Sequence, residues 1–236
     1  MAASLRDGLT AIVVAGGSAQ RFGQDKLFLR LAGRPVLAWS LLAFETSPWV
    51  GSIVLVLSQA NLQRGRRLVA RTGLRKVRVI CAGGRRRQDS AWRGLEAAAG
   101  AEWVLIHDGA RPFVTPELIE RGFLLARDVG GSVAAVPVHD TIKIVEHDNL
   151  IQRTPRRANL WAAQTPQFFR YELLVEAYGR NGDQDVTDDA ELLERAGRPV
   201  AVYPGSYDNV KITTPEDLPL ARAIARRRAR RPERIA

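Results

Sequence analysis

Several features that are scarce in this sequence exclude whole classes of protein. The only cysteine among the 236 residues is Cys81, so an intramolecular disulfide and a cysteine-rich metal site are excluded. No apolar run approaches the ~20 residues that span a bilayer, and residues 1–10 lack the basic start and long apolar stretch of a signal peptide. Ordinary proportions of glycine and proline exclude collagen-like and disordered chains. We therefore expect one soluble domain over residues 1–236, in the reducing cytoplasm, with no membrane partner.

Lysine is also scarce, because only four of the 35 basic residues are lysines. The net charge is +10, and residues 226–236, with six arginines and one glutamate, contribute half of it. A basic terminal helix that continues into a frayed tail is typical of a solvated chain end, and nothing resembles an aromatic-rich RNA-binding signature or a zinc finger. Small phosphorylated ligands explain the remaining basic residues better than nucleic acid does. A nucleic-acid-binding protein that uses the arginine-rich tail stays open as an alternative.

Strand and helix patterns alternate along the chain. Short apolar runs predict strands over residues 9–15, 53–57, 77–81, 103–107, 132–138, 200–203 and 210–213. Helical spacing predicts helices over 35–45, 60–72, 88–99, 115–128, 171–179 and 187–196, and a last helix capped by residues 214–217. This order predicts a Rossmann-like α/β fold, with a largely parallel twisted sheet, helices on both faces, and ligands at the carboxyl ends of the strands.

Residues 140–157 interrupt this alternation. Residues 141–146 and 150–154 alternate apolar and polar side chains, and the HDN sequence at 147–149 is typical of a turn. We expect a β-hairpin arm that projects from the domain. Because a lone two-stranded hairpin is marginally stable in water, the arm is predicted to pack against the partner subunit of a homodimer.

A glycine-rich segment with two cations follows the first predicted strand. It reads AGGSAQRFGQDK over residues 15–26. Backbone N–H groups at Ala15, Gly16 and Gly17 can approach anionic oxygens closely, and Arg21 and Lys26 supply positive charge. The segment is neither a P-loop nor a dinucleotide fingerprint, because both of those glycine patterns are absent. It therefore predicts a phosphate site of another kind.

The segment resembles the signature loop of sugar nucleotidyltransferases, and its Asp-Lys pair also occurs in molybdenum-cofactor guanylyltransferases. Further motifs along the chain distinguish between these families. They are GGRRRQDS (83–90), HDGARP (107–112), DTIK (140–143), RANLW (157–161), QTPQ (164–167), VTDD (186–189) and DNVK (208–211). This ordered set, over residues 10–222, resembles that of the 2-C-methyl-D-erythritol 4-phosphate cytidylyltransferases. Those enzymes transfer a cytidylyl group from CTP to a sugar-alcohol phosphate in the non-mevalonate route to isoprenoids.

The resemblance implies roles for particular residues. The catalytic cations, in contact with the triphosphate and the transition state, would be Arg21, Lys26 and Lys211. The nucleotide would lie against Ala15, Gly16, Gly17, Gly84 and Ser90. The sugar-alcohol phosphate would lie against Arg111, Thr141, Arg157 and Thr187. Mg²⁺ or another divalent cation would be held by Asp108, with Asp208 as a second candidate carboxylate.

Elementary phosphate chemistry agrees with a site made of cations. A phosphate monoester has a second pKa of about 6, so it is already an ionised nucleophile near neutral pH and needs no general base. The barrier then comes from repulsion between anions and from charge that develops at the α-phosphate, and cations and a metal lower it. The three histidines are scattered. His107 follows four apolar residues, so we expect a packed, hydrogen-bonded histidine rather than a catalyst.

Other interpretations stay open at this point. A cytidylyltransferase for another polyol phosphate, such as ribitol 5-phosphate, shares most of these motifs. A guanylyltransferase is disfavoured by the HDGARP motif and by the arm. Purely structural roles are also open for Asp108 as a turn cap, for Lys211 as a solvent-facing strand residue, and for Ser90 as an ordinary residue of a first helical turn.

Overall fold

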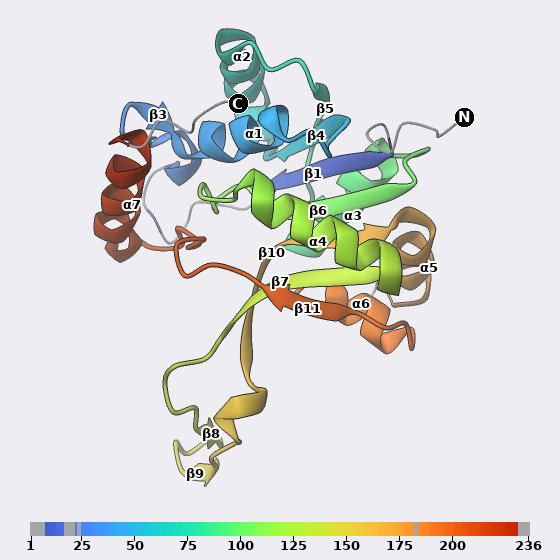
Figure 1. Ribbon diagram of the computed structural model, residues 1–236, viewed down its shortest axis with the longest axis vertical. Coiled ribbons are helices and arrows are strands. Elements are labelled where there is room, and N and C mark those ends of the chain that lie inside the picture. Colours follow the sequence, from blue (N-terminus) through green and yellow to red (C-terminus); the bar gives the residue numbers. More distant parts are fainter. Residues whose placement is uncertain (1–7, 17–21, 23–24, 182–183, 231–236) are drawn as a thin grey trace.

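A seven-stranded sheet forms the centre of the computed structural model, which describes residues 8–16, 22, 25–181 and 184–230 (Figure 1). In spatial order its strands are β11 (Ala201–Pro204), β7 (Gly131–Pro137), β10 (Trp161–Arg170), β6 (Trp103–Asp108), β1 (Leu9–Ala15), β4 (Ser52–Leu57) and β5 (Val77–Ala82). All pairings within this sheet are parallel except those that β10 makes with β6 and β7. The predicted largely parallel α/β sheet is confirmed.

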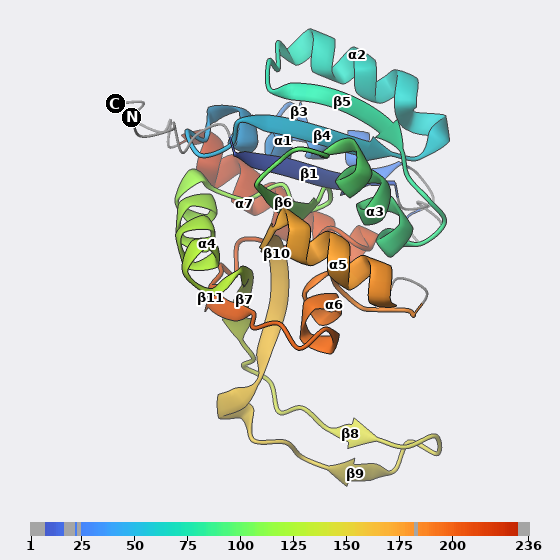
Figure 2. The ribbon, with the colours of Figure 1, turned by 90° about the vertical axis from the view of Figure 1, so that its right-hand side faces the viewer.

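Helices cover both faces of the sheet, because its central strands are apolar on both sides. Side chains of β1 alternate between two core clusters. Ala11 and Val13 pack in the cluster that contains α1 (Val36–Thr46), α2 (Leu62–Thr72, preceded by η2, Gln59–Asn61) and α4 (Pro116–Val129). Ile12 and Val14 pack in the cluster that contains α3 (Arg87–Ala97), α5 (Tyr171–Asn181) and α6 (Ala190–Arg195). Figure 2 shows α4 on one side of the sheet and α3 and α5 on the other. Within the described ranges, no helix is long and apolar enough to cross a membrane.

The last helix, α7 (Leu218–Arg230), packs on a third, smaller cluster. Ala221 and Ile224 belong to it, together with the buried Phe113, Ile212 and Leu31. Leu31 comes from a short hairpin made of β2 (Arg30–Leu31) and β3 (Arg34–Pro35), which the sequence patterns did not predict. A short helix, η4 (Pro215–Asp217), precedes α7 and begins with the predicted cap at residue 214. Residues 226–230 of the basic tail therefore belong to a helix, and residues 231–236 lie outside the described residues.

The predicted arm extends away from the sheet (Figures 1 and 2). Its paired strands are shorter than expected, with β8 at Ile144–Val145 and β9 at Ile151–Arg153, and the short helix η3 (Arg157–Asn159) follows. Apolar side chains on the arm are exposed in this single chain, notably Leu150 at 66% and Ile151 at 59%. The arm therefore presents apolar surface that its own domain does not cover.

Three further details of the prediction are wrong, each for a local reason. Strand β10 was not predicted, because Pro166 and a register shift between Ala163 and Gln167 interrupt its alternation. Residues 210–213 pair with no strand; instead the Ile212 N–H donates to the Ala110 carbonyl at 2.9 Å. The helix expected over 187–196 begins only at Ala190, the first residue of α6. Before it, the Thr187 hydroxyl donates to the Glu191 carboxylate and the Asp188 carboxylate accepts from the Gln167 amide.

Candidate active site

Backbone packing joins the carboxyl ends of β1 and β5. Gly16 directly follows Ala15 at the end of β1, and a Cβ atom on Gly16 would lie only 2.9 Å from the Ser90 hydroxyl oxygen. A Cβ on Gly83 would lie 2.5 Å from the same oxygen, so both positions require glycine. The Ser90 hydroxyl also accepts a hydrogen bond from the Gly84 N–H at 3.1 Å. The structure thus brings four of the predicted nucleotide-binding residues together.

The remaining part of the glycine-rich loop is described only at its ends. Gly17 and Arg21 lie outside the described residues. Lys26 opens the short helix η1 (Lys26–Phe28), whose N-cap is Asp25. The Asp25 carboxylate accepts from the Leu27 N–H at 3.3 Å, which fixes the start of η1. The catalytic roles of Arg21 and Lys26 stay predictions.

Asp108 is the centre of a cluster of cations at the carboxyl end of β6. Its Oδ1 accepts from the Arg87 Nε at 2.9 Å, and its Oδ2 accepts from the Lys211 Nζ at 2.8 Å. The Arg111 Nε lies 3.8 Å from the same Oδ2. Burial opposes ionisation of Asp108, but the charges of Arg87 and Lys211 outweigh burial and hold the pKa of its carboxyl well below its ordinary value. Asp108 is therefore a permanent anion at neutral pH that gathers three cations around it.

A second buried carboxylate holds Arg87 from its other end. Asp189 is fully buried and accepts from the Arg87 Nη1 at 2.7 Å. It also accepts from the Tyr178 hydroxyl at 2.8 Å. Burial, together with the charge of Asp189, raises the pKa of the Tyr178 phenol, so this hydroxyl stays a donor at any physiological pH. Because both carboxylates fix its guanidinium, Arg87 has little freedom to move.

Beneath Asp108, a chain of hydrogen bonds joins β6 to β10 and uses His107. The Asp108 N–H donates to the Thr165 hydroxyl oxygen at 3.0 Å, and the Thr165 hydroxyl lies 3.0 Å from the His107 Nδ1. The His107 Nε2 lies 2.9 Å from the Arg111 carbonyl, so this nitrogen carries the proton and the ring is neutral. Burial lowers the pKa of His107 to about 4. The predicted packed, hydrogen-bonded histidine is confirmed.

Arg111 and Lys211 belong to two loops that bond to each other. The Arg111 Nη1 donates to the Asn209 carbonyl at 2.7 Å. The buried Asn209 side chain donates to the Thr165 carbonyl at 2.8 Å, which ties its loop to β10. Lys211, two residues on, keeps 40% of its side chain exposed. A cation that touches a buried carboxylate and still faces solvent is well placed to meet an anionic ligand.

The other predicted acceptor-binding residues lie apart from this cluster. The Arg157 Nη1 donates to the His139 carbonyl at 2.6 Å, at the base of the arm, and Thr141 is exposed. The Thr187 hydroxyl donates to the Glu191 carboxylate at 3.0 Å. In the described part of the chain, no hydrogen bond or ion pair joins Thr141, Arg157 or Thr187 to Asp108. Their roles toward a sugar-alcohol phosphate stay predictions.

The two predicted metal-binding carboxylates are each engaged by a cation. Asp108 contacts Arg87 and Lys211, as described above, and Asp208 pairs with the Arg227 guanidinium. Within residues 8–16, 22, 25–181 and 184–230, no group of three or more acidic, histidine or cysteine side chains could hold a metal ion. A protein cage for a metal is therefore absent from the described ranges, whereas Mg²⁺ that is bound mainly by substrate phosphates needs only one or two carboxylates.

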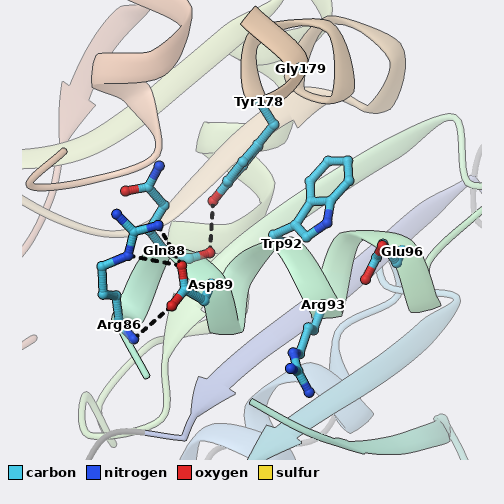
Figure 3. Close-up of a pocket in the computed structure, with 8 residues that line it drawn as sticks. All are labelled: Arg86, Gln88, Asp89, Trp92, Arg93, Glu96, Tyr178 and Gly179. Atoms are coloured by element: carbon cyan, nitrogen blue, oxygen red, sulfur yellow. Dashed lines mark hydrogen bonds and ion pairs between the residues drawn. The ribbon is translucent and has the colours of Figure 1, made fainter. Parts of the chain in front are cut away.

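The pocket drawn in Figure 3 lies outside this cluster, on the surface between α3 and α5. It has a volume of about 540 Å³, and Trp92 and Tyr178 form part of its wall. At its rim, Arg86 pairs with Asp89 and Asp185, both at 2.7 Å. The Tyr178 hydroxyl donates to Asp189, the carboxylate that pairs with Arg87. The pocket therefore lies next to the residues that hold Arg87, and Asp108 does not line it.

Comparison with known proteins identifies the family of this chain. The family model described as 2-C-methyl-D-erythritol 4-phosphate cytidylyltransferase matches residues 9–227. The chain belongs to this family. The 2-C-methyl-D-erythritol 4-phosphate cytidylyltransferase of Dehalococcoides mccartyi is 45% identical over 224 residues, which cover 94% of this chain and 98% of that protein. The enzyme of Microcystis aeruginosa that carries the same name is 45% identical over 222 residues, 92% of this chain and 98% of that one.

Solved structures of the family share the fold. The 4-diphosphocytidyl-2C-methyl-D-erythritol synthase of Anaerococcus prevotii matches with a TM-score of 0.84 and 29% identity, over 95% of this chain and all of that one. The 2-C-methyl-D-erythritol 4-phosphate cytidylyltransferase of Thermus thermophilus matches with a TM-score of 0.75 and 35% identity, over 92% and 98% of the two chains. The Rossmann-like fold expected from the sequence is that of the cytidylyltransferase family.

Sequence reasoning left four residues out of the cytidylyltransferase site. Arg87 lies in the GGRRRQDS motif, and Thr165, Asp189 and Asn209 lie in QTPQ, VTDD and DNVK, but the sequence alone assigns no role to them. All four hold the Asp108 cluster in place. Their presence in ordered motifs was the available signal. Thr165, Asp189 and Asn209 are buried, and Arg87 is held between two buried carboxylates, so these residues support the site, a role that spacing alone does not reveal.

Proposed function

We propose that this chain transfers the cytidylyl group of CTP to 2-C-methyl-D-erythritol 4-phosphate and releases pyrophosphate. Membership of the cytidylyltransferase family over residues 9–227 supports this activity. The observation that carries the proposal is the cation cluster at Asp108, beside the glycine-lined end of β1. A site that combines glycine-rich backbone with surplus cations suits two phosphorylated substrates.

The reaction needs positive charge more than it needs a base. A phosphate oxygen of the acceptor attacks the α-phosphorus of CTP, a new P–O bond forms, and the bond to the β-phosphate oxygen breaks as pyrophosphate leaves. The attacking phosphate is ionised near neutral pH, because its second pKa is about 6. We assign Lys26, Arg21 and Lys211 to the triphosphate, where their charges offset the repulsion between the substrates. His107 takes no part, because its neutral ring is bonded within the protein.

A divalent cation could be bound by one protein carboxylate together with oxygens of the nucleotide. Asp108 would hold it, and nucleotide phosphates would supply further oxygens, which agrees with the small number of protein ligands that Mg²⁺ needs. When bound, the cation would offset the negative charge that develops around the α-phosphate. Asp208 stays a predicted second ligand, and it would have to exchange its bond to Arg227 for that role.

The acceptor site is proposed to be completed by a second copy of this chain. The arm exposes Leu150 and Ile151, and no bond links its base to the Asp108 cluster within the described residues of one chain. In a homodimer joined through residues 140–157, Thr141 and Arg157 would reach the partner's site. Arg157 would hold the acceptor phosphate with two parallel N–H donors, a role for which lysine is a poorer substitute.

An assay of pyrophosphate release over four nucleotides and several sugar-alcohol phosphates tests the proposed function. We expect turnover with CTP and 2-C-methyl-D-erythritol 4-phosphate, and at least tenfold lower kcat/KM with ribitol 5-phosphate. A preference for ribitol 5-phosphate would replace the acceptor and keep the reaction. A preference for GTP, or salt-dependent DNA binding without any nucleotidyl transfer, would contradict the proposal.

A further inference from the structure

Two arginines near the end of α7 contact the two loops that carry Arg111 and Lys211. Arg227 pairs with the carboxylate of Asp208, three residues before Lys211. Arg228 donates from Nη2 to the Phe113 carbonyl at 2.9 Å, and its guanidinium carbon lies 5.3 Å from the centre of the Phe113 ring. Phe113 belongs to the loop that follows β6. The basic end of the chain, which the chemistry itself does not use, therefore touches both loops.

The loop that carries Lys211 is attached both to the interior and to α7. On the interior side, the Asn209 amide bonds to the Thr165 carbonyl, and the Ile212 N–H donates to the Ala110 carbonyl at 2.9 Å. On the outer side, Arg227 pairs with Asp208. The side chains of that pair are 56% and 38% exposed, so its contribution to folding stability is small. Its effect should be on the position of the loop.

We propose that Arg227 is a positioning residue for Lys211, and that Arg228 has the same function for the loop after β6. Together they fix both loops to α7, which is itself anchored through the buried Ala221 and Ile224. The inference rests on the proposed function, because Lys211 is assigned to the triphosphate there. It also replaces the metal-binding role that the sequence predicts for Asp208, because it makes the Asp208 carboxylate an attachment point for α7.

Steady-state kinetics of Arg227→Gln provide the first test. An exposed pair is worth up to about 1 kcal/mol, so we expect kcat to fall by about three- to fivefold, with KM for CTP changed less than twofold. Arg227→Lys should recover most of the loss. Arg226→Gln, on the exposed face of the same helix, is the matched control and should keep the wild-type kcat. Equal kcat values for Arg227→Gln and Arg226→Gln would overturn the proposal.

Hydrogen exchange of the amides in residues 205–213, without substrates, gives a readout that does not depend on turnover. We expect faster exchange in Arg227→Gln and unchanged exchange in Arg226→Gln. A wild type without cytidylyl transfer would refute the proposed function, and exchange would still decide whether Arg227 holds this loop. Unchanged exchange in Arg227→Gln, or faster exchange with an unchanged kcat in an active enzyme, would overturn the positioning role.

Asp208→Asn, alone and combined with Arg227→Gln, separates an attachment point from a metal ligand. If Asp208 acts through Arg227, the double variant should lose no more kcat than Arg227→Gln alone. The Mg²⁺ concentration for half-maximal activity should also stay the same in all three variants. A further loss in the double variant, together with a raised Mg²⁺ requirement, would overturn the assignment of Asp208 to α7.

Discussion

Replacement of Arg87 by methionine should destabilise the protein strongly, because Arg87 is the shared partner of two buried carboxylates. The side chains of Asp108 and Asp189 are only 9% and 1% exposed, and each lies within 2.9 Å of the Arg87 guanidinium. Removal of one partner from a buried ion pair costs about 3–5 kcal/mol, since a charge is left without compensation. For a chain of this size, that cost lowers Tm by about 10 °C or more.

Urea unfolding followed by circular dichroism measures this cost directly. Arg85→Met is the matched control, because Arg85 is an exposed neighbour in the same motif and its replacement should change the free energy of unfolding by less than about 0.5 kcal/mol. Addition of Asp189→Asn to Arg87→Met should recover part of the loss, because one unpaired charge disappears while an acceptor for Tyr178 remains. The difference in the free energy of unfolding between wild type and Arg87→Met should be largest above pH ~4 and should decrease below it. The reason is that the pKa of Asp108 is lowered in the folded protein.

Two results would refute this reasoning. One is an Arg87→Met variant as stable as Arg85→Met, and the other is an Asp189→Asn addition that lowers stability further. Lys211→Met provides the contrast, because Asp108 keeps Arg87 and Lys211 is 40% exposed. Its stability should fall much less, whereas its turnover should fall by about 10²–10³, the usual effect of losing one pre-organised donor.

Three further predictions concern other parts of the site. Lys26→Ala should lower kcat by about 10²–10³ and CTP binding far less, and normal turnover at saturating Mg²⁺ would contradict its catalytic role. His107→Asn should keep substantial turnover in folded protein. Between pH 6.5 and 4 the wild-type free energy of unfolding should fall by about 3 kcal/mol more than that of His107→Asn, because the unfolded chain binds the proton at about 6.5 and buried His107 only at about 4. Equal pH dependence would show that His107 is not buried as described. Lys26→Ala and Arg157→Ala homodimers should both be nearly inactive, whereas co-refolding them in equal amounts should restore roughly a quarter of wild-type activity. No recovery in mixed dimers verified by mass would place Arg157 in its own subunit's site.

The order of strands and helices could be predicted because most of the signals are local. Buried parallel strands such as β1 and β4 are continuous apolar runs, and α4 begins where the helix over 115–128 was predicted, with Thr115 as its N-cap. Strand β10 could not be predicted in the same way. Its alternation is interrupted at Pro166, and its central position between β6 and β7 depends on pairings with distant residues.

In the candidate site too, residues in short motifs could be predicted, whereas contacts between distant residues could not. Gly16, Gly84 and Ser90 belong to short motifs in which glycine is needed because a Cβ atom would be too close to neighbouring atoms. The structure brings these three residues together. The pairing of Arg87 with Asp189 spans 102 residues, and only the fold reveals it. A motif thus indicates that a residue belongs to the site, whereas its partner follows from tertiary packing.

The most direct test of the central claim is to follow the phosphorus atoms of CTP. Incubation with 2-C-methyl-D-erythritol 4-phosphate and CTP labelled at either the α- or the γ-phosphate should send the α label into a cytidine diphosphate product. The γ label should appear in pyrophosphate, because the acceptor phosphate attacks the α-phosphorus. Transfer of the γ label to the acceptor, or release of the α label as free CMP with no diphosphate product, would contradict cytidylyl transfer at this site.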